Sequence, residues 1–205
     1  MSSVIKKVGD NLTKKLQDDP HQHTENFIFI HINKTGGSSI EKALEVTFEH
    51  KTAREKIKEI GHQQWKNSFT FTVIRNPWDK VVSHYHWRVQ TNQTDLGVKP
   101  VEFRDWVRLT YGDKDSFYYD KPMMFMPQAD WITDQVGGIL VNYICRFENI
   151  NHDFNYVCRK LGKTVSLPHT KASEHDHYKV YYDKETIEIV ARWFKEDIKR
   201  FSYVY

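Results

Sequence analysis

Two short apolar segments, each followed directly by a polar loop and a helix signal, constrain the fold of this chain most. Residues 27–32 read FIFIHI and residues 69–74 read FTFTVI. Short runs of this kind, rich in β-branched and aromatic residues, are typical of strands buried in a sheet. Apolar residues at helical spacing follow both segments, at 40–48 and at 81–89. Strands that alternate with helices predict an α/β fold with a mainly parallel sheet flanked by helices.

The rest of the chain extends this alternation. Residues 139–147 predict a third strand, and residues 184–200 predict one last amphipathic helix. The stretch 112–128 contains one glycine and two prolines and predicts a long surface loop. Residues 1–26 are polar and predict a loose N-terminal arm, which leaves residues 27–205 as one globular domain by length and pattern.

The charge balance and the absence of long apolar runs exclude several classes of protein. Lys and Arg together number 30 and Asp and Glu 27, so the net charge is +3. A balance so close to neutral argues against a protein that coats nucleic acid through charge alone. No apolar run approaches the ~18 residues of a membrane helix, and the first residues lack the apolar core of a signal peptide. We therefore expect a soluble, cytoplasmic protein without a membrane span.

The loop after the first apolar segment has the chemistry of an anion site. It contains a cation, two glycines and three hydroxyl residues: Lys34, Thr35, Gly36, Gly37, Ser38 and Ser39. The glycines allow the backbone to approach a ligand closely, and the following helix offers free N–H groups and the positive end of its dipole. This combination predicts binding of a phosphate or sulfate group. The loop is not a Walker A motif, because its lysine precedes the glycines.

The loop after the second apolar segment offers another cation. Arg75 follows the segment at its carboxyl end, where ligands of open α/β sheets bind. Asn76 and Pro77 are favoured at the N-cap and at the first position of a helix, so a helix is predicted to begin there. Ser83 lies two turns further along this helix and can donate to the same ligand. A ligand with two separated phosphates would use both loops.

These two units, taken together, resemble a known family. FIFIHINKTGGSSI (27–40) and FTFTVIRNPWDKVVSHY (69–85) resemble the 5′-phosphosulfate loop and the 3′-phosphate motif of sulfotransferases, above all those of the carbohydrate sulfotransferase branch. The resemblance continues through CRFENINHDF (145–154), LPH (167–169) and the C-terminal segment. It covers about residues 27–205.

The resemblance implies the P-loop-like sulfotransferase fold, a reaction and a set of roles. It implies transfer of a sulfuryl group from PAPS (3′-phosphoadenosine 5′-phosphosulfate) to a hydroxyl acceptor of carbohydrate type, by in-line displacement and without a metal. Lys34 to Ser39 would hold the 5′-phosphosulfate, and Lys34 would also act in catalysis by stabilising the leaving oxygen. Arg75 and Ser83 would hold the 3′-phosphate. Lys171 and Ser173 would close over the nucleotide.

The resemblance also places a histidine base between the two motifs. Histidine suits a base that takes a proton near neutral pH. His50, after the first predicted helix, stands at the family's usual place, and we take it as the base. His62 lies in the same interval and stays an alternative, as do the carboxylates Glu41 and Glu55. His84, on the helix after the second loop, is interpreted as a packing or surface residue.

Two other functions share some of these features. A P-loop nucleotide kinase or hydrolase would have the same sheet, but the chain lacks the Walker A lysine position and a clear Mg²⁺-binding acidic strand end. A non-catalytic nucleotide- or glycan-binding module would keep the fold without the chemistry. His169, His175 and His177 lack the spacing of a metal motif, so no metal site is predicted. Trp87 and Trp131 are candidates to stack on a sugar.

Overall fold

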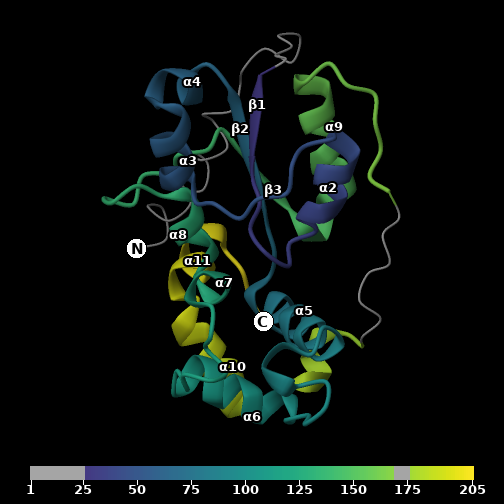
Figure 1. Ribbon diagram of the computed structural model, residues 1–205, viewed down its shortest axis with the longest axis vertical. Coiled ribbons are helices and arrows are strands. Elements are labelled where there is room, and N and C mark those ends of the chain that lie inside the picture. The colour runs from purple at the N-terminus through teal and green to yellow at the C-terminus, as the bar shows by residue number, and fades with distance from the viewer. Residues whose placement is uncertain (1–25, 169–175) are drawn as a thin grey trace, which may run out of the picture.

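The computed structural model describes residues 26–168 and 176–205. Within them, one sheet contains three parallel strands in the order β1 (Phe27–Ile30), β2 (Phe69–Ile74) and β3 (Tyr143–Arg146) (Figure 1). The predicted α/β fold with a parallel sheet is confirmed. β2 has the predicted bounds, whereas β1 and β3 are shorter than predicted.

Helices connect these strands and follow the last one. In chain order they are α2 (Gly37–Leu44), α3 (Ala53–Ile60), α4 (His62–Lys66), α5 (Pro77–Gln90), α6 (Phe103–Val107), α7 (Pro122–Phe125), α8 (Gln128–Ile132), α9 (Ile150–Lys160), α10 (Lys184–Trp193) and α11 (Lys195–Phe201). Short 3₁₀ turns are η1 (Gln93–Asp95), η3 (Phe147–Asn149) and η4 (Tyr178–Tyr181), and a π-helical turn, η2 (Arg108–Gly112), extends α6. As predicted, α5 begins at Pro77, and the side chain of Asn76 accepts a hydrogen bond from the N–H of Trp78 at 3.0 Å.

Alternate side chains of the strands belong to two apolar clusters, one on each face of the sheet. Ile28 and Ile30 pack with residues of α3, α4, α8 and α11. Phe29, Phe71 and Val73 pack with residues of α2 and α9. Figure 1 shows α2 and α9 on one side of the strands and α3 and α4 on the other. Because successive side chains of a strand point to opposite faces, both faces of this apolar sheet are covered by helices.

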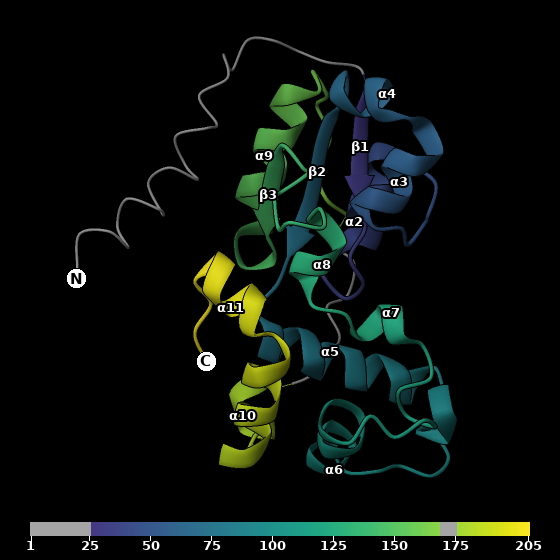
Figure 2. The same cartoon turned by 90° about the vertical axis from the view of Figure 1, so that its left-hand side faces the viewer.

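A third apolar cluster lies beyond the carboxyl ends of the strands. It joins α5, α6 and α10 and contains the fully buried Trp106, Phe125 and Phe194. Figure 2 shows these helices below the sheet. α5 enters the cluster through Val81 and Val82. The start of α5 therefore lies at the junction between the sheet and this helical layer.

The stretch 112–128 is not the continuous surface loop that the sequence predicted. Pro122 is the first residue of α7, and Pro127 is the N-cap of α8. Pro122 therefore occupies the first helical position, which its fixed φ favours, and Pro127 directly precedes a helix. Phe125 and Gln128, inside this stretch, are fully buried.

Two predicted helices also differ in the structure. The helix predicted over 184–200 is divided into α10 and α11 at Phe194, whose φ of −100° and ψ of 26° interrupt the helical backbone. The first helix, predicted from apolar residues up to Phe48, ends at Leu44. Glu45 stops it by adopting left-handed backbone, with φ of 57°.

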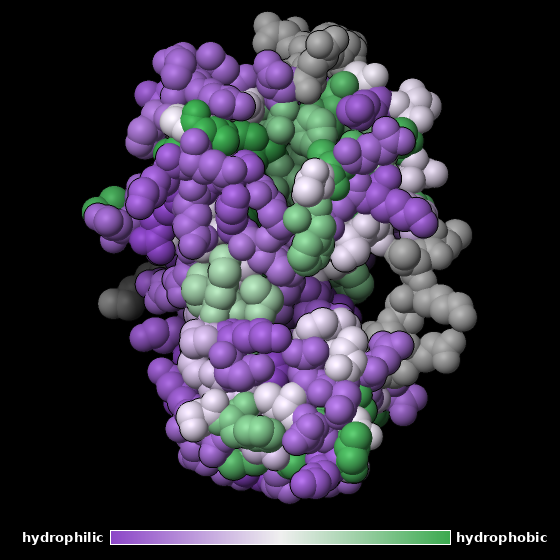
Figure 3. All heavy atoms as spheres, viewed as in Figure 1, coloured by the Kyte–Doolittle hydropathy of each residue, from purple (hydrophilic) through white to green (hydrophobic). Residues whose placement is uncertain are grey.

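The surface of the described part of the chain is largely polar. Hydrophilic side chains cover most of the face in Figure 3, where hydrophobic residues form separate patches. No helix among the described residues is both long enough and apolar enough to cross a membrane. Of the predicted arm, residues 1–25 lie outside the described residues.

Candidate functional site

A pocket of about 720 Å³ is formed by the segments that follow β1 and β2. Its lining includes nearly all the described residues that the sequence predicted for the site: Lys34, Gly36, Gly37, Ser38, Ser39, His50, Arg75 and Ser83. The loop after β1 and the start of α5 therefore face the same space. The two loops predicted to bind anions share one pocket.

The backbone of the first loop is shaped to receive an anion. Lys34 and Gly36 both have left-handed backbone, with φ of 64° and 85°. Gly36 is the N-cap of α2, and no side chain caps this helix end. Uncapped N–H groups at a helix start attract anions. The next position also requires glycine, because a Cβ at Gly37 would collide with the ring of His31.

Thr35 has a different place from the other residues of the loop. Its side chain is fully buried and does not line the pocket. Its hydroxyl donates to the backbone oxygen of Ile32 at 2.8 Å. A hydroxyl has one proton to donate, so this side chain stabilises the turn of the loop instead of donating to a ligand.

Two cations lie close together on the pocket wall. The Nη1 of Arg75 donates to the backbone oxygen of Lys34 at 3.2 Å, which ties the second loop to the first. Burial and the nearby charge of Arg75 lower the pKa of Lys34 to about 8. A bound anion would offset the repulsion between these cations. The pocket is therefore suited to a ligand that carries negative charge.

Three contacts orient the guanidinium of Arg75. Its Nε donates to Oδ2 of Asp79 at 2.7 Å, and its Nη1 donates to the backbone of Lys34. Its Cζ lies 4.1 Å from the centre of the Phe147 ring. Ser83, on the same helix, is buried and lines the same pocket. A guanidinium held in this way offers its remaining N–H groups in a fixed direction, as phosphate recognition requires.

His50 has the geometry of a general base. Its Nδ1 lies 2.9 Å from the backbone oxygen of His31. A carbonyl oxygen only accepts, so Nδ1 carries the proton and the lone pair of the neutral ring is on Nε2. The rings of His31 and Phe48 lie 4.5 and 4.7 Å from that of His50, centre to centre, and restrict its orientation.

The alternative bases lie elsewhere. His62 is exposed at the start of α4 and does not line the pocket. Glu55 belongs to the capping box of α3, where its Oε2 accepts from the N-cap N–H at 2.7 Å. Glu41 is buried, with its Oε1 2.7 Å from Nδ1 of His31. Of these four residues, only His50 lines the pocket.

His31 is a pocket residue that sequence reasoning missed. It is buried, and burial together with the charges of His50 and Lys34 lowers its pKa to about 3. Its backbone oxygen fixes the tautomer of His50, and its ring packs on Gly37. Glu41 holds the other side of the ring. The only sequence signal was a histidine at the end of an otherwise apolar segment.

Two exposed aromatic side chains also line the pocket. Phe48 is 61% exposed and lies beside His50. Trp87 is 37% exposed, and its ring centre lies 5.5 Å from Nζ of Lys34. Of the two tryptophans considered for sugar stacking, Trp87 lines the pocket, whereas Trp131 is fully buried in the core.

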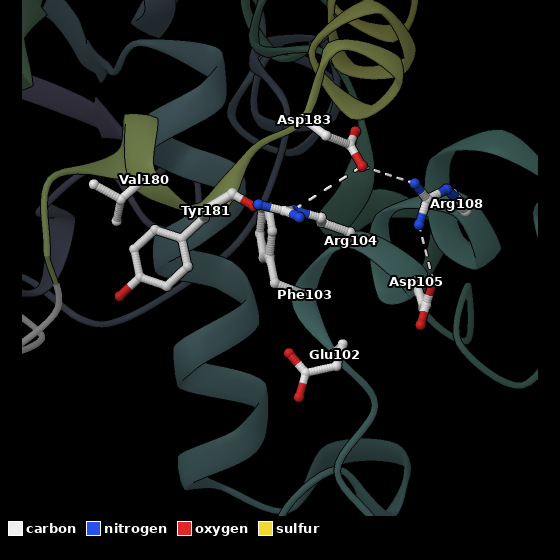
Figure 4. A pocket seen from close by; sticks show the side chains of 8 residues that line it. All are labelled: Glu102, Phe103, Arg104, Asp105, Arg108, Val180, Tyr181 and Asp183. Carbon is white, nitrogen blue, oxygen red and sulfur yellow. Dashed lines mark hydrogen bonds and ion pairs between the residues drawn. The ribbon is translucent and has the colours of Figure 1, made fainter.

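A second pocket, of about 490 Å³, lies between α6 and η4 (Figure 4). Its cations are paired within the pocket: Arg108 contacts Oδ2 of Asp183 at 2.8 Å and Oδ1 of Asp105 at 2.9 Å. Figure 4 shows Arg104 directed toward Asp183 as well. None of the sequence-predicted site residues lines this pocket. Its charges stabilise the packing of α6 against the segment before α10.

Several candidates from the sequence cannot be placed. Lys171 and Ser173 lie outside the described residues, as do His169 and His175. Among the residues that the structure describes, no group of three or more His, Cys, Asp or Glu side chains is arranged to hold a metal ion.

Comparison with known proteins gives one match. The model of a family described as the sulfotransferase family matches residues 21–204, which include every residue of the pocket. No curated protein and no solved structure matched the chain.

Proposed function

Because the chain belongs to the sulfotransferase family, we propose that it moves a sulfuryl group from PAPS to a hydroxyl of a ring-shaped acceptor, with His50 as the base. Membership of this family makes the protein an enzyme and implies PAPS as its co-substrate. The observation that carries the finer proposal is the single pocket in which the anion loop, Arg75 and His50 occur together.

The residues of the pocket fit the two anionic ends of PAPS. The loop after β1, with Lys34, Gly37 and Ser38, would bind the 5′-phosphosulfate through N–H groups, hydroxyls and charge. Arg75 and Ser83 would bind the 3′-phosphate. The hydrogen bond from Arg75 to the backbone of Lys34 keeps the two sites at a fixed separation.

The proposed reaction is a direct displacement at sulfur. Nε2 of His50 removes the proton of the acceptor hydroxyl while the acceptor oxygen forms its bond to sulfur. The bond between sulfur and the bridging oxygen breaks, and its electron pair stays on the 5′-phosphate of the departing PAP. The charge of Lys34 stabilises that oxygen as negative charge develops on it. Holding the acceptor hydroxyl and PAPS in line supplies a large part of the rate enhancement.

The aromatic side chains at the pocket support a ring-shaped acceptor. Ligand pockets are commonly lined by aromatic side chains, and the exposed rings of Phe48 and Trp87 lie beside His50 and Lys34, the proposed catalytic pair. Flat apolar faces of this kind pack on the C–H face of a sugar. We therefore propose a carbohydrate acceptor, and a panel of sugar glycosides and phenols with labelled PAPS would distinguish it from an aromatic alcohol.

A ligand panel followed by a turnover assay tests the proposed function. PAP should raise the melting temperature of the protein, and ATP and AMP should raise it far less, because only PAP offers a separate 3′-phosphate to Arg75. Label from PAPS should then appear in the acceptor. A larger shift with ATP would favour a nucleotide kinase or hydrolase reaction, and binding of PAP without any transfer would contradict the proposed catalysis.

Arg75→Ala should weaken PAP binding by about 1.5–3 kcal/mol, the range for a charged hydrogen bond to phosphate. Calorimetric titration with PAP measures this loss. Arg104→Ala is the matched control, because Arg104 belongs to the second pocket. Unchanged PAP affinity in Arg75→Ala would remove this residue from the site.

PAP affinity should fall as the pH rises through about 8, since the pKa of Lys34 in the free protein is lowered to about 8. Below this pH the side chain is charged and attracts PAP; above it, binding must first restore the proton. Titrations above about pH 7, where the phosphates of PAP no longer change charge, measure the effect. Burial also lowers the pKa of Lys80 to about 8. Lys34→Ala is therefore the control: its PAP affinity should be nearly independent of pH in this range, and a persisting fall would assign the effect to Lys80.

A further inference from the structure

We propose that Gln128 is a positioning residue for the 3′-phosphate site, because its side-chain amide holds both backbone polar groups of Arg75. This inference rests on the proposed function, in which Arg75 binds the 3′-phosphate of PAPS. Gln128 does not line the pocket and lies 53 positions from Arg75 in the chain.

Two hydrogen bonds join the side chain of Gln128 to the backbone of Arg75. The backbone N–H of Arg75 donates to Oε1 of Gln128 at 2.8 Å, and Nε2 of Gln128 donates to the backbone oxygen of Arg75 at 2.8 Å. Both hydrogen bonds are buried, and the Gln128 side chain is 0% exposed. Two short buried hydrogen bonds to one residue leave its backbone little freedom to rotate.

The position of this contact, just beyond the end of β2, explains why it fixes the backbone of Arg75. The ladder between β2 and β3 ends at the pair Ile74 and Arg146, so Arg75 is the first residue beyond the end of β2. The amide of Gln128 takes the place of a further rung. The next N–H, that of Asn76, donates to Oε1 of Glu148 at 2.6 Å. Hydrogen bonds to the backbone of Arg75 and to that of Asn76 therefore fix the turn that orients the Arg75 side chain.

Gln128 is itself held by a buried carboxylate. Asp197, from α11, accepts from the backbone N–H of Gln128 at 2.8 Å and from that of Ala129 at 2.7 Å. Its Oδ2 also lies 3.2 Å from Nε2 of Gln128. The amide nitrogen therefore uses one proton on Asp197 and one on Arg75, which fixes the amide orientation. Asp197 is 0% exposed, so no water competes for these bonds.

Binding of two nucleotides distinguishes a positioning role from a merely structural one. PAP and AMP differ only in the 3′-phosphate. In Gln128→Met, which keeps the length of the side chain and removes both hydrogen bonds, PAP affinity should fall on the order of tenfold. AMP affinity should change by less than about twofold, because no residue of the loop from Lys34 to Ser39, here called the 5′ loop, is substituted. Gln135→Met, an exposed glutamine, is the matched control and should bind both ligands as the wild type does.

A double-mutant cycle completes the test. In the Arg75→Ala background, Gln128→Met should cause no further loss of PAP affinity, since the residue that it positions is gone. Equal losses for PAP and AMP, or a full additional loss in the Arg75→Ala background, would overturn the proposal. If Gln128→Met does not fold, Gln128→Asn keeps an amide that is one methylene shorter and should show a smaller loss confined to PAP. A wild-type protein that binds PAP no better than AMP would instead contradict the proposed 3′-phosphate site itself.

Discussion

His50→Ala should lower the turnover of sulfuryl transfer by roughly 10²–10⁴-fold while PAP affinity stays close to that of the wild type. The loss is expected because Nδ1 of His50 is committed to the backbone oxygen of His31, which leaves Nε2 to take the acceptor proton. PAP affinity should persist because His50 belongs to neither of the two loops that would bind the nucleotide. Initial rates with labelled PAPS and calorimetric titration with PAP measure the two effects separately.

The pH profile and a matched variant sharpen this prediction. The acidic limb of the kcat/KM profile should disappear in His50→Ala, since that limb reports the neutral imidazole. His62→Ala should retain activity, because His62 is exposed on α4 and does not line the pocket. If His50→Ala keeps near-normal turnover while His62→Ala is inactive, the base is His62. If both variants stay active, the assignment of a histidine base is wrong.

Lys34→Ala should lower kcat by about 10²–10³-fold, more than it lowers PAP affinity. Negative charge on the leaving oxygen develops only in the transition state, so an interaction with that oxygen acts mainly on the rate. The geometry supports a larger effect on kcat than on PAP affinity. Lys34 shares the pocket with His50, and the variant keeps the other groups that would bind PAP, namely the rest of the 5′ loop and Arg75. Steady-state rates at saturating PAPS, together with PAP titrations, measure it.

The control for Lys34 lies on the adjacent helix. Lys42→Ala removes the same charge from an exposed position of α2 that does not line the pocket, and it should leave both parameters unchanged. The substitution at Lys34 does not relieve backbone strain, because alanine has the same difficulty as lysine with a φ of 64°. Loss of PAP affinity with an unchanged kcat would make Lys34 a binding residue without a catalytic role.

The sequence predicted those parts of the site that depend on local chemistry. The loop from Lys34 to Ser39 and the Asn-Pro start of α5 each carry their signal within a few residues, and the structure brings both to one pocket. Parallel strands explain why the two loops lie together, since the carboxyl ends of such strands meet at the same edge of the sheet. Thr35 does not line this pocket, and its residue type alone could not reveal that its hydroxyl donates to the backbone.

The parts that the sequence could not predict depend on contacts between distant segments. Phe48 has the spacing of a helix face, yet the left-handed backbone of Glu45 ends the helix and leaves Phe48 at the pocket. Gln128 lies in a stretch that proline content assigns to a loop, and only the packing of α8 against α11 brings its amide to Arg75. No periodicity or motif records such a pairing, because the partners share neither an element nor a spacing.

A crystal structure of the wild-type protein with PAP tests the central claim most directly. The account predicts the 3′-phosphate within hydrogen-bond distance of Arg75 and Ser83, and the 5′-phosphate on the N–H groups at the start of α2 beside Lys34. Nε2 of His50 should face the side of the 5′-phosphate where sulfur would lie. PAP bound with its 3′-phosphate away from Arg75, or bound in the pocket between α6 and η4, would contradict the account.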